Sequence, residues 1–277
     1  MLSGGLERGV GWCDVGWVQS THKISGDAAA GFAAYLTAGA SRGDYYAGDG
    51  DDEAAGMWHG SPAALTALGL DVERGVGRGE LVSLMRGVSP GDGSVIRRVG
   101  ADGSRVAGID VTFGAPKSVS ALWAVSDGYR RAQIEVAHRA AVASARERIE
   151  REVAVVRRRE DGVLRWERAR SLVAAEFVHT ASRLTADQDA GSGGPDPQLH
   201  SHLVVLAAER ADGRFAAVDS RELFRSARVN GAWYRAELAS RLGGLGVGGA
   251  WPDGPRWPVF RAGGRAVGVV GAVVGAV

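Results

Sequence analysis

The chain has 277 residues, of which 45% are hydrophobic and 23% charged. This composition predicts one or two globular domains with a substantial core, and it excludes wholesale disorder, a collagen-like chain and a polytopic membrane protein. The net charge of +1 excludes a uniformly basic coat for nucleic acid but leaves room for a local basic groove. The single cysteine, Cys13, excludes an intrachain disulfide and a cysteine zinc cluster, and we expect a cytoplasmic location.

Neither end of the sequence has the pattern of a targeting or spanning segment. Residues 1–20 lack an apolar run, so we expect an N-terminal extension there and no secretory signal. Residues 259–277 predict an irregular tail whose end contains only Ala, Gly and Val and is shorter than the about 20 residues that span a bilayer. This tail is either an unpacked segment or the out-of-frame end of an interrupted gene, and we favour the second explanation.

The first third of the chain predicts short helices separated by loops. Residues 26–40 have helical spacing, with Asp27 as the expected N-cap. Residues 41–60 are rich in Gly and Asp and predict a loop. Residues 61–87 predict short helices around their leucines, Leu65, Leu68, Leu70, Leu81 and Leu84.

The middle of the chain combines a strand with helices. Residues 106–113 alternate in polarity, so Asp110 is expected to face away from the large apolar side chains of that strand. Residues 117–126 predict a helix, and residues 128–156 predict a longer one with an apolar stripe and an opposite face of Arg and Glu.

The last third predicts two strands, at 171–179 and 199–207, joined by a long polar loop. A turn at 211–214 precedes a helical region over 221–242, with Ser220 as its expected cap. Helices and strands therefore follow one another with hairpin-like turns, which favours an α+β fold over a doubly wound α/β sheet.

Three histidines on the two predicted late strands form the strongest chemical pattern. His200 and His202 are two residues apart, so a strand places both imidazoles on one face. If the two strands are neighbours, His179 joins them, and three neutral nitrogens suit a divalent transition metal. The alternative is a pair of surface histidines on a strand edge.

The other three histidines lack such support. His138 lies on or near the apolar stripe of the predicted helix and is expected to pack in the core. His22 and His59 have no predicted ligand partner.

Asp110 and three tyrosines are further candidates for chemistry. A buried Asp110 would need a partner, and it could orient a metal-bound histidine or take a proton from a nucleophile. The alternative is a partly exposed strand carboxylate. Tyr35, Tyr45 and Tyr46 cluster early in the chain, and an aryl phosphate ester retains the energy of the broken bond. Tyrosine therefore suits reversible breaking of DNA, although Tyr35 could equally be a core residue.

Several stretches match a known family in the same order and cover most of residues 20–245. They are AAYLTAGASRGDYYAGDG at 33–50, WHG at 58–60, GIDVTFGAPKSVSALW at 108–123, FVHTASR at 177–183, DPQLHSHLVVL at 196–206, DGRF at 212–215 and YRAEL at 234–238. Through these stretches the sequence resembles the relaxase domain of TrwC/TraI-type conjugative relaxases, the MobF class of HUH endonucleases. The resemblance implies an antiparallel sheet with flanking helices and a relaxase domain over residues 21–258.

The resemblance also implies an activity and its residues. The family nicks one strand of plasmid DNA at the origin of transfer through a tyrosine that becomes joined to the 5′ phosphate. It implies a metal triad of His179, His200 and His202, a first nucleophile at Tyr35, and a second at Tyr45 or its neighbour Tyr46. Asp110 matches the acidic residue beside them. The expected cofactor is a divalent cation (Mg²⁺, Mn²⁺ or Zn²⁺). The expected partners are single-stranded origin DNA and relaxosome accessory and coupling proteins, with no membrane partner.

The sequence departs from the family pattern at several places. The usual first tyrosine pair is Tyr35–Leu36 here, and the insertion TADQDAGSGG separates His179 from His200. The family's following helicase is not expected, because neither lysine belongs to a GxxxxGK[ST] loop. The irregular tail, the missing helicase and the altered loop suggest an alternative, a truncated, inactive remnant that at most binds single-stranded DNA. A third alternative, a generic histidine-metal hydrolase or oxygenase, explains the histidine triad but not the clustered tyrosines. Trp58 and the arginine-rich segment 157–170 are candidates for DNA contact, against a structural or solvated role.

Overall fold

The structure is a computed structural model of the chain. It describes residues 19–38, 56–97, 106–182, 195–250, 259–262 and 265–266. Tyr45, Tyr46 and the whole insertion TADQDAGSGG lie outside these residues. No helix within the described ranges is both long and apolar enough to cross a bilayer.

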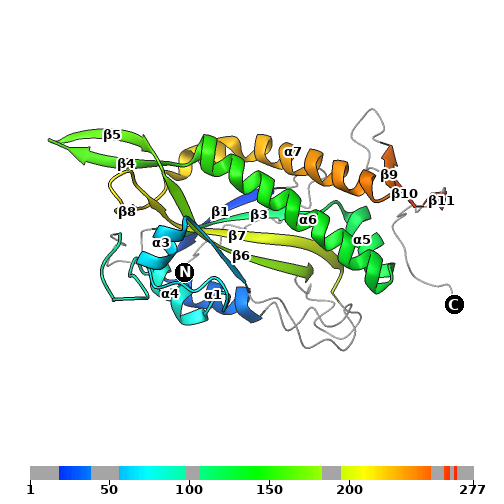
Figure 1. Cartoon of the computed structure of the whole chain (residues 1–277), viewed down its shortest axis with the longest axis horizontal. Coiled ribbons are helices and arrows are strands. Elements are labelled where there is room, and N and C mark those ends of the chain that lie inside the picture. Colours follow the sequence, from blue (N-terminus) through cyan, green and yellow to red (C-terminus); the bar gives the residue numbers. More distant parts are fainter. Residues whose placement is uncertain are drawn as a thin grey trace, which may run out of the picture.

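A central antiparallel sheet organises the fold (Figure 1). Its strands follow the order β1–β3–β7–β6–β2, and β8 adds to β7. The strands are β1 (Gln19–Ser25), β2 (Met57–His59), β3 (Val106–Gly114), β6 (Ser171–Ala181), β7 (Pro197–Glu209) and β8 (Phe215–Ala216). The antiparallel sheet with flanking helices confirms the predicted α+β class, and β3, β6 and β7 confirm the three predicted strands.

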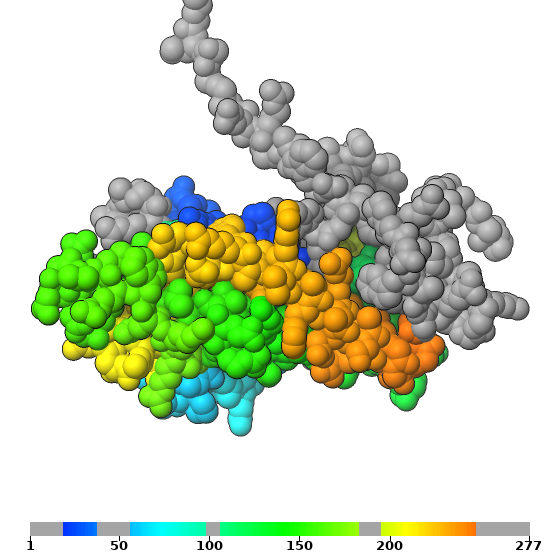
Figure 2. Space-filling view, turned by 90° about the horizontal axis from the view of Figure 1, so that it is seen from above, coloured from blue at the N-terminus to red at the C-terminus, as the bar shows by residue number. Residues whose placement is uncertain are grey.

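Three helices cover one face of the sheet: α5 (Lys117–Val125), α6 (Gly128–Arg148) and α7 (Ser220–Gly244). Helices α6 and α7 lie side by side and form the outer surface in Figure 2. The apolar side of β3, carried by Ile109, Val111 and Phe113, packs beneath them in the larger core. Strand alternation leaves Asp110 on the other face, as predicted.

The opposite face carries α1 (Ala29–Ala38), α3 (Pro62–Ala67) and α4 (Arg78–Met85), which enclose a second core. Leu65, Leu68, Leu81 and Leu84 are buried there, which agrees with the short helices predicted over 61–87. The sheet is therefore buried on both faces, and α1 lies beside the end of the sheet that carries the histidines.

The long predicted helix over 128–156 is wrong at its C-terminal end. Helix α6 ends at Arg148, one π-helical turn, η1 (Ile149–Val153), follows, and the chain then forms a hairpin of β4 (Val155–Glu160) and β5 (Val163–Arg168). Asp161 and Gly162 both have positive φ, at 50° and 79°. This is the signature of a tight turn that matches strand twist, so the turn chemistry overrides the helical spacing.

Two helices begin at other residues than predicted. Asp219 caps α7 by accepting the Arg221 N–H, so Ser220 is not the cap. Helix α1 begins at Ala29, and Asp27 instead accepts the N–H of Ala28.

Several strands lie where none was predicted. Strand β1 begins before the predicted domain boundary at residue 21, and β2 lies inside the predicted loop 41–60. A small separate sheet joins β9 (Val247–Ala250), β10 (Val259–Ala262) and β11 (Arg265–Ala266), and the last two lie in the segment predicted to be irregular.

Candidate metal centre

Three buried imidazoles converge on the face of the sheet that carries α1. His179 on β6 is the register partner of His200 on β7, and His202 follows two residues later on the same face. One ring nitrogen from each lies within 4.8 Å of those of the other two. The predicted convergence is therefore confirmed, and the alternative of exposed histidines on a strand edge is wrong because all three side chains are buried within a paired sheet.

Hydrogen bonds to the outer nitrogens orient two of the rings. The Nδ1–H of His200 donates to the carbonyl of Gln198 at 2.8 Å, and the Nδ1–H of His202 donates to Asp110 at 2.9 Å. A carbonyl or carboxylate acceptor requires the proton on Nδ1, so in the neutral ring each Nε2 carries a lone pair. The Nε2 of His202 is buried with no hydrogen-bond partner among the described residues.

Electrostatics favours a neutral His200 ring in this cluster. Burial, reinforced by the neighbouring His202, lowers the pKa of His200 to about 3. A neutral imidazole near pH 7 can donate its lone pair to a cation. An orphaned buried Nε2 beside two more imidazoles fits a divalent metal ion, whose binding would satisfy that atom.

Asp110 is a buried carboxylate behind this cluster. It is 4% exposed, and both of its oxygens lie within hydrogen-bond distance of the Nδ1 of His202, at 2.9 and 3.1 Å. The Thr112 hydroxyl donates to it at 3.2 Å. The alternative of a partly exposed carboxylate is therefore wrong, and the geometry is that of an acceptor that fixes the orientation of a histidine ring.

Tyr35 lies beside the histidines on helix α1. Its ring is edge-on to His179 and His202, with centroids 5.6 and 5.9 Å away. The Leu36 carbonyl on the same helix lies 3.3 Å from the Nε2 of His179. Helix α1 therefore places the Tyr35 ring against the histidine cluster, and Tyr35 is only partly buried.

One buried polar pair and one exposed ion pair were missed by sequence reasoning. Glu176 on β6 is bonded to His59 on β2 at 2.8 Å, on the sheet face opposite the histidine cluster. A carboxylate inside the apolar run of 171–179 was the available signal for it. Trp58 is buried in the second core, which supports its structural role over DNA contact. Lys117 links the start of α5 to Asp196 and the Pro197 carbonyl at the start of β7.

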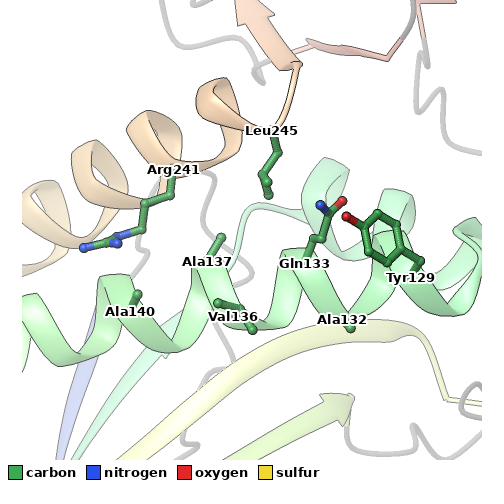
Figure 3. Close-up of a pocket in the computed structure, with 8 residues that line it drawn as sticks. All are labelled: Tyr129, Ala132, Gln133, Val136, Ala137, Ala140, Arg241 and Leu245. Carbon is green, nitrogen blue, oxygen red and sulfur yellow. The ribbon is translucent and has the colours of Figure 1, made fainter.

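A separate hollow lies between the helices on the far side of the sheet (Figure 3). It has a volume of about 320 Å³ between the N-terminal half of α6 and the end of α7. Its lining is mainly apolar, with Tyr129 and Arg241 at its rim. None of the histidines, Asp110 or Tyr35 lines this hollow, so it is not part of the candidate metal centre.

Comparison with known proteins identifies relatives of this protein. Residues 29–261 match the family described as TrwC relaxase. The chain is 31% identical over 217 residues to the multifunctional conjugation protein TraI of Escherichia coli, and 30% identical over 224 residues to TraI of E. coli strain K12. These matches cover 74% and 77% of the chain, which spans only 11% and 12% of the length of these relatives.

Solved structures agree with the fold. A metal-bound conjugative relaxase TrwC in complex with oriT DNA aligns at a TM-score of 0.67 and 31% identity, over 85% of this chain and 73% of that one. TrwC with a 27-mer DNA comprising the recognition hairpin and the cleavage site aligns at 0.66 and 30% identity, over 88% and 74% of the two chains.

Proposed function

The chain belongs to the TrwC relaxase family, and we propose that it nicks one DNA strand at a plasmid origin of transfer and so initiates conjugative transfer. One observation carries this proposal: the Tyr35 ring lies against two of the three convergent buried histidines, His179 and His202. A tyrosine beside a metal centre is an arrangement that can cleave a phosphodiester through a covalent intermediate.

We assign His179, His200 and His202 as the metal ligands. A bound divalent cation would withdraw charge from the scissile phosphate and fix its position. Three imidazole donors suit a transition metal such as Zn²⁺ better than Mg²⁺, although Mg²⁺ and Mn²⁺ belong in the same test. The TrwC structures solved with and without metal support a divalent ion at this site.

Tyr35 is the proposed first nucleophile. Its phenolic oxygen forms a bond to phosphorus while the bond from phosphorus to the 3′ oxygen breaks. The phenol gives up its proton to a base and the 3′ oxygen takes one up, leaving a 5′-phosphotyrosine and a free 3′ hydroxyl. Asp110 holds the His202 ring in place through its Nδ1–H, and acceptance of the phenol proton is its second proposed role. Tyr45 or Tyr46 would act in a second transesterification.

The hairpin of β4 and β5 is the proposed basic contact surface for DNA. It extends from one end of the molecule and carries exposed arginines together with Trp166, whose ring is half exposed (Figure 1). Arg158 and Arg165 share Glu160, whereas Arg159 is exposed without an ion pair among the described residues. Phosphate contacts by such side chains supply affinity that falls with salt. A local surface of this kind reconciles DNA binding with a net charge of +1.

The remaining assignments rest on the same family membership. We propose one relaxase domain through residue 258, acting in the cytoplasm, with accessory and coupling proteins as its partners. The intact histidine cluster and Asp110 support an active nickase over an inactive remnant.

The test is covalent adduct formation with an origin-containing oligonucleotide and Mg²⁺, Mn²⁺ or Zn²⁺. Wild type is expected to form an adduct that mass spectrometry maps to Tyr35, and Tyr35→Phe should abolish the first cleavage. Tyr129→Phe is the matched control, because Tyr129 is an exposed tyrosine on α6 far from the cluster and should leave the adduct unchanged. Oligonucleotide binding without any adduct would instead support the remnant, and cleavage after loss of Tyr35, Tyr45 and Tyr46 would support a histidine-metal hydrolase.

A further inference from the structure

A fully buried hydrogen-bonded chain runs behind the metal centre, on the helix-covered face of the sheet. The Nδ1 of His138 on α6 lies 2.7 Å from the Tyr234 hydroxyl on α7, and its Nε2 lies 2.9 Å from the Ser201 hydroxyl on β7. All three side chains have no exposed surface. These hydrogen bonds therefore join both outer helices, α6 and α7, to the strand that carries two of the histidines.

Packing alone does not require polar groups at these positions. Their surroundings are apolar, with the Tyr234 ring 5.4 Å from that of Phe113 in the larger core. Burying three polar groups is costly unless each finds a partner, so apolar residues of similar volume would fill the space at lower cost. A satisfied buried polar network instead specifies one arrangement of the elements that it connects.

The central histidine stays neutral in this environment. Burial lowers the pKa of His138 to about 3, and burial raises the pKa of Tyr234 above its usual value. A neutral imidazole offers one donor and one acceptor, which matches the two hydroxyls on either side of it. The three side chains therefore form a hydrogen-bonded network that carries no net charge near neutral pH.

Ser201 connects this hydrogen-bonded network to the candidate ligands. It lies between His200 and His202 on β7, and strand alternation turns its side chain to the helices while both imidazoles face the metal centre. The preceding residue on the helix-covered face is also held: the Leu199 N–H donates to the Ser120 hydroxyl at 3.1 Å, and the Leu199 carbonyl accepts from the N–H of Ala115 at 2.9 Å. The ligand-bearing segment is therefore fixed from behind at two alternate residues.

We propose that His138 and Tyr234 are positioning residues for the metal centre. Acting through the Ser201 hydroxyl, they fix the twist of β7 between His200 and His202, and so the separation and direction of two ligand nitrogens. This inference rests on the proposed function, since it assumes that the histidine cluster holds a metal.

The experiment is a Co²⁺ titration of metal-free protein followed by visible absorption, with thermal unfolding of the same metal-free samples. His138→Phe keeps the ring volume but removes both hydrogen bonds, and Tyr234→Phe removes a single hydroxyl. Each is expected to weaken Co²⁺ binding by about tenfold and to alter the Co²⁺ spectrum. This loss is near the lower end of the range seen when groups that orient metal ligands are changed. His138→Gln can supply a donor and an acceptor again and should recover part of the affinity.

Val142→Ala is the matched control, because Val142 lies four residues along the same face of α6 and is equally buried, but makes no hydrogen bond to β7 through its side chain. It should lower the melting temperature and leave the affinity and spectrum for Co²⁺ unchanged. Wild-type affinity and spectrum in both phenylalanine variants would overturn this inference and leave the proposed metal centre standing. An equal loss of affinity in Val142→Ala would do the same. A wild-type protein that binds no Co²⁺ would refute the proposed metal centre itself. If His138→Phe does not fold, Tyr234→Phe decides the question.

Discussion

Replacing Asp110 by Asn tests whether this carboxylate sets the orientation of a metal ligand. Asp110 accepts the Nδ1–H of His202 at 2.9 Å, and both side chains are less than a tenth exposed, so water screens the contact little. A hydrogen bond to a charged group contributes about 1.5–3 kcal/mol, whereas one between neutral groups contributes about 1 kcal/mol. Because the Asn oxygen can still accept this bond, metal affinity should fall about tenfold, and Asp110→Ala should approach a 100-fold loss.

The assay is the same Co²⁺ titration, joined by adduct formation with the origin oligonucleotide. Glu176→Gln is the control, since Glu176 is also a buried carboxylate bonded to a histidine but lies on the opposite face of the sheet. It should change stability and leave the affinity for Co²⁺ unaltered. Unchanged Co²⁺ affinity in Asp110→Ala, with the fold intact, would falsify the assignment of Asp110 as the group that orients His202.

Two further predictions concern stability. Gly69 has φ of +67°, and a Cβ there would lie 2.6 Å from the Cα of Gly91, so Gly69→Ala should lower the free energy of unfolding in urea by about 2–3 kcal/mol. Gly79→Ala in α4 meets no atom within 4 Å and should be neutral or stabilising by up to about 1 kcal/mol; equal effects at both glycines would contradict this reasoning. Hydrogen bonds from the Arg221 side chain, the Arg221 N–H and Trp166 hold the pKa of Asp219 well below its usual value. This carboxylate therefore stabilises the fold above about pH 4, and the stabilisation is lost as the pH falls further. The unfolding free energy of Asp219→Asn should therefore be lower than that of wild type at pH 7, and the difference should shrink below about pH 4; a constant difference from pH 7 to pH 3 would show that the charge has no role.

Local patterns predicted the elements that carry the site. The alternation in β3 placed Asp110 on the face opposite Phe113, and the spacing of His200 and His202 placed both rings on one face. These predictions are correct because side-chain direction in a strand has a period of two and depends only on neighbouring residues. The meeting of His179 with His200 required one further assumption, that the two strands pair with each other.

The helical spacing failed where a local turn competed with it. The apolar stripe of α6 continues in sequence to Val153 and Val156, and this extended the predicted helix through residue 156. The Asp161–Gly162 turn instead pairs Val155–Glu160 with Val163–Arg168, and Val156 still reaches the larger core from the hairpin. A buried valine is compatible with either element, so burial alone could not choose between a helix and a strand.

His138 shows why a correct prediction of burial can miss what a residue does. Its place on the apolar stripe of α6 correctly predicted a packed side chain, yet both of its hydrogen-bond partners are far away in sequence, at Ser201 and Tyr234. A stripe reports which side of a helix faces the core, and it carries no information about which residue of another element stands opposite. Only the tertiary structure places the histidine directly behind the strand segment between His200 and His202. A polar residue on an apolar stripe is therefore a reason to look for the strand it contacts, and here that strand carries the proposed metal ligands.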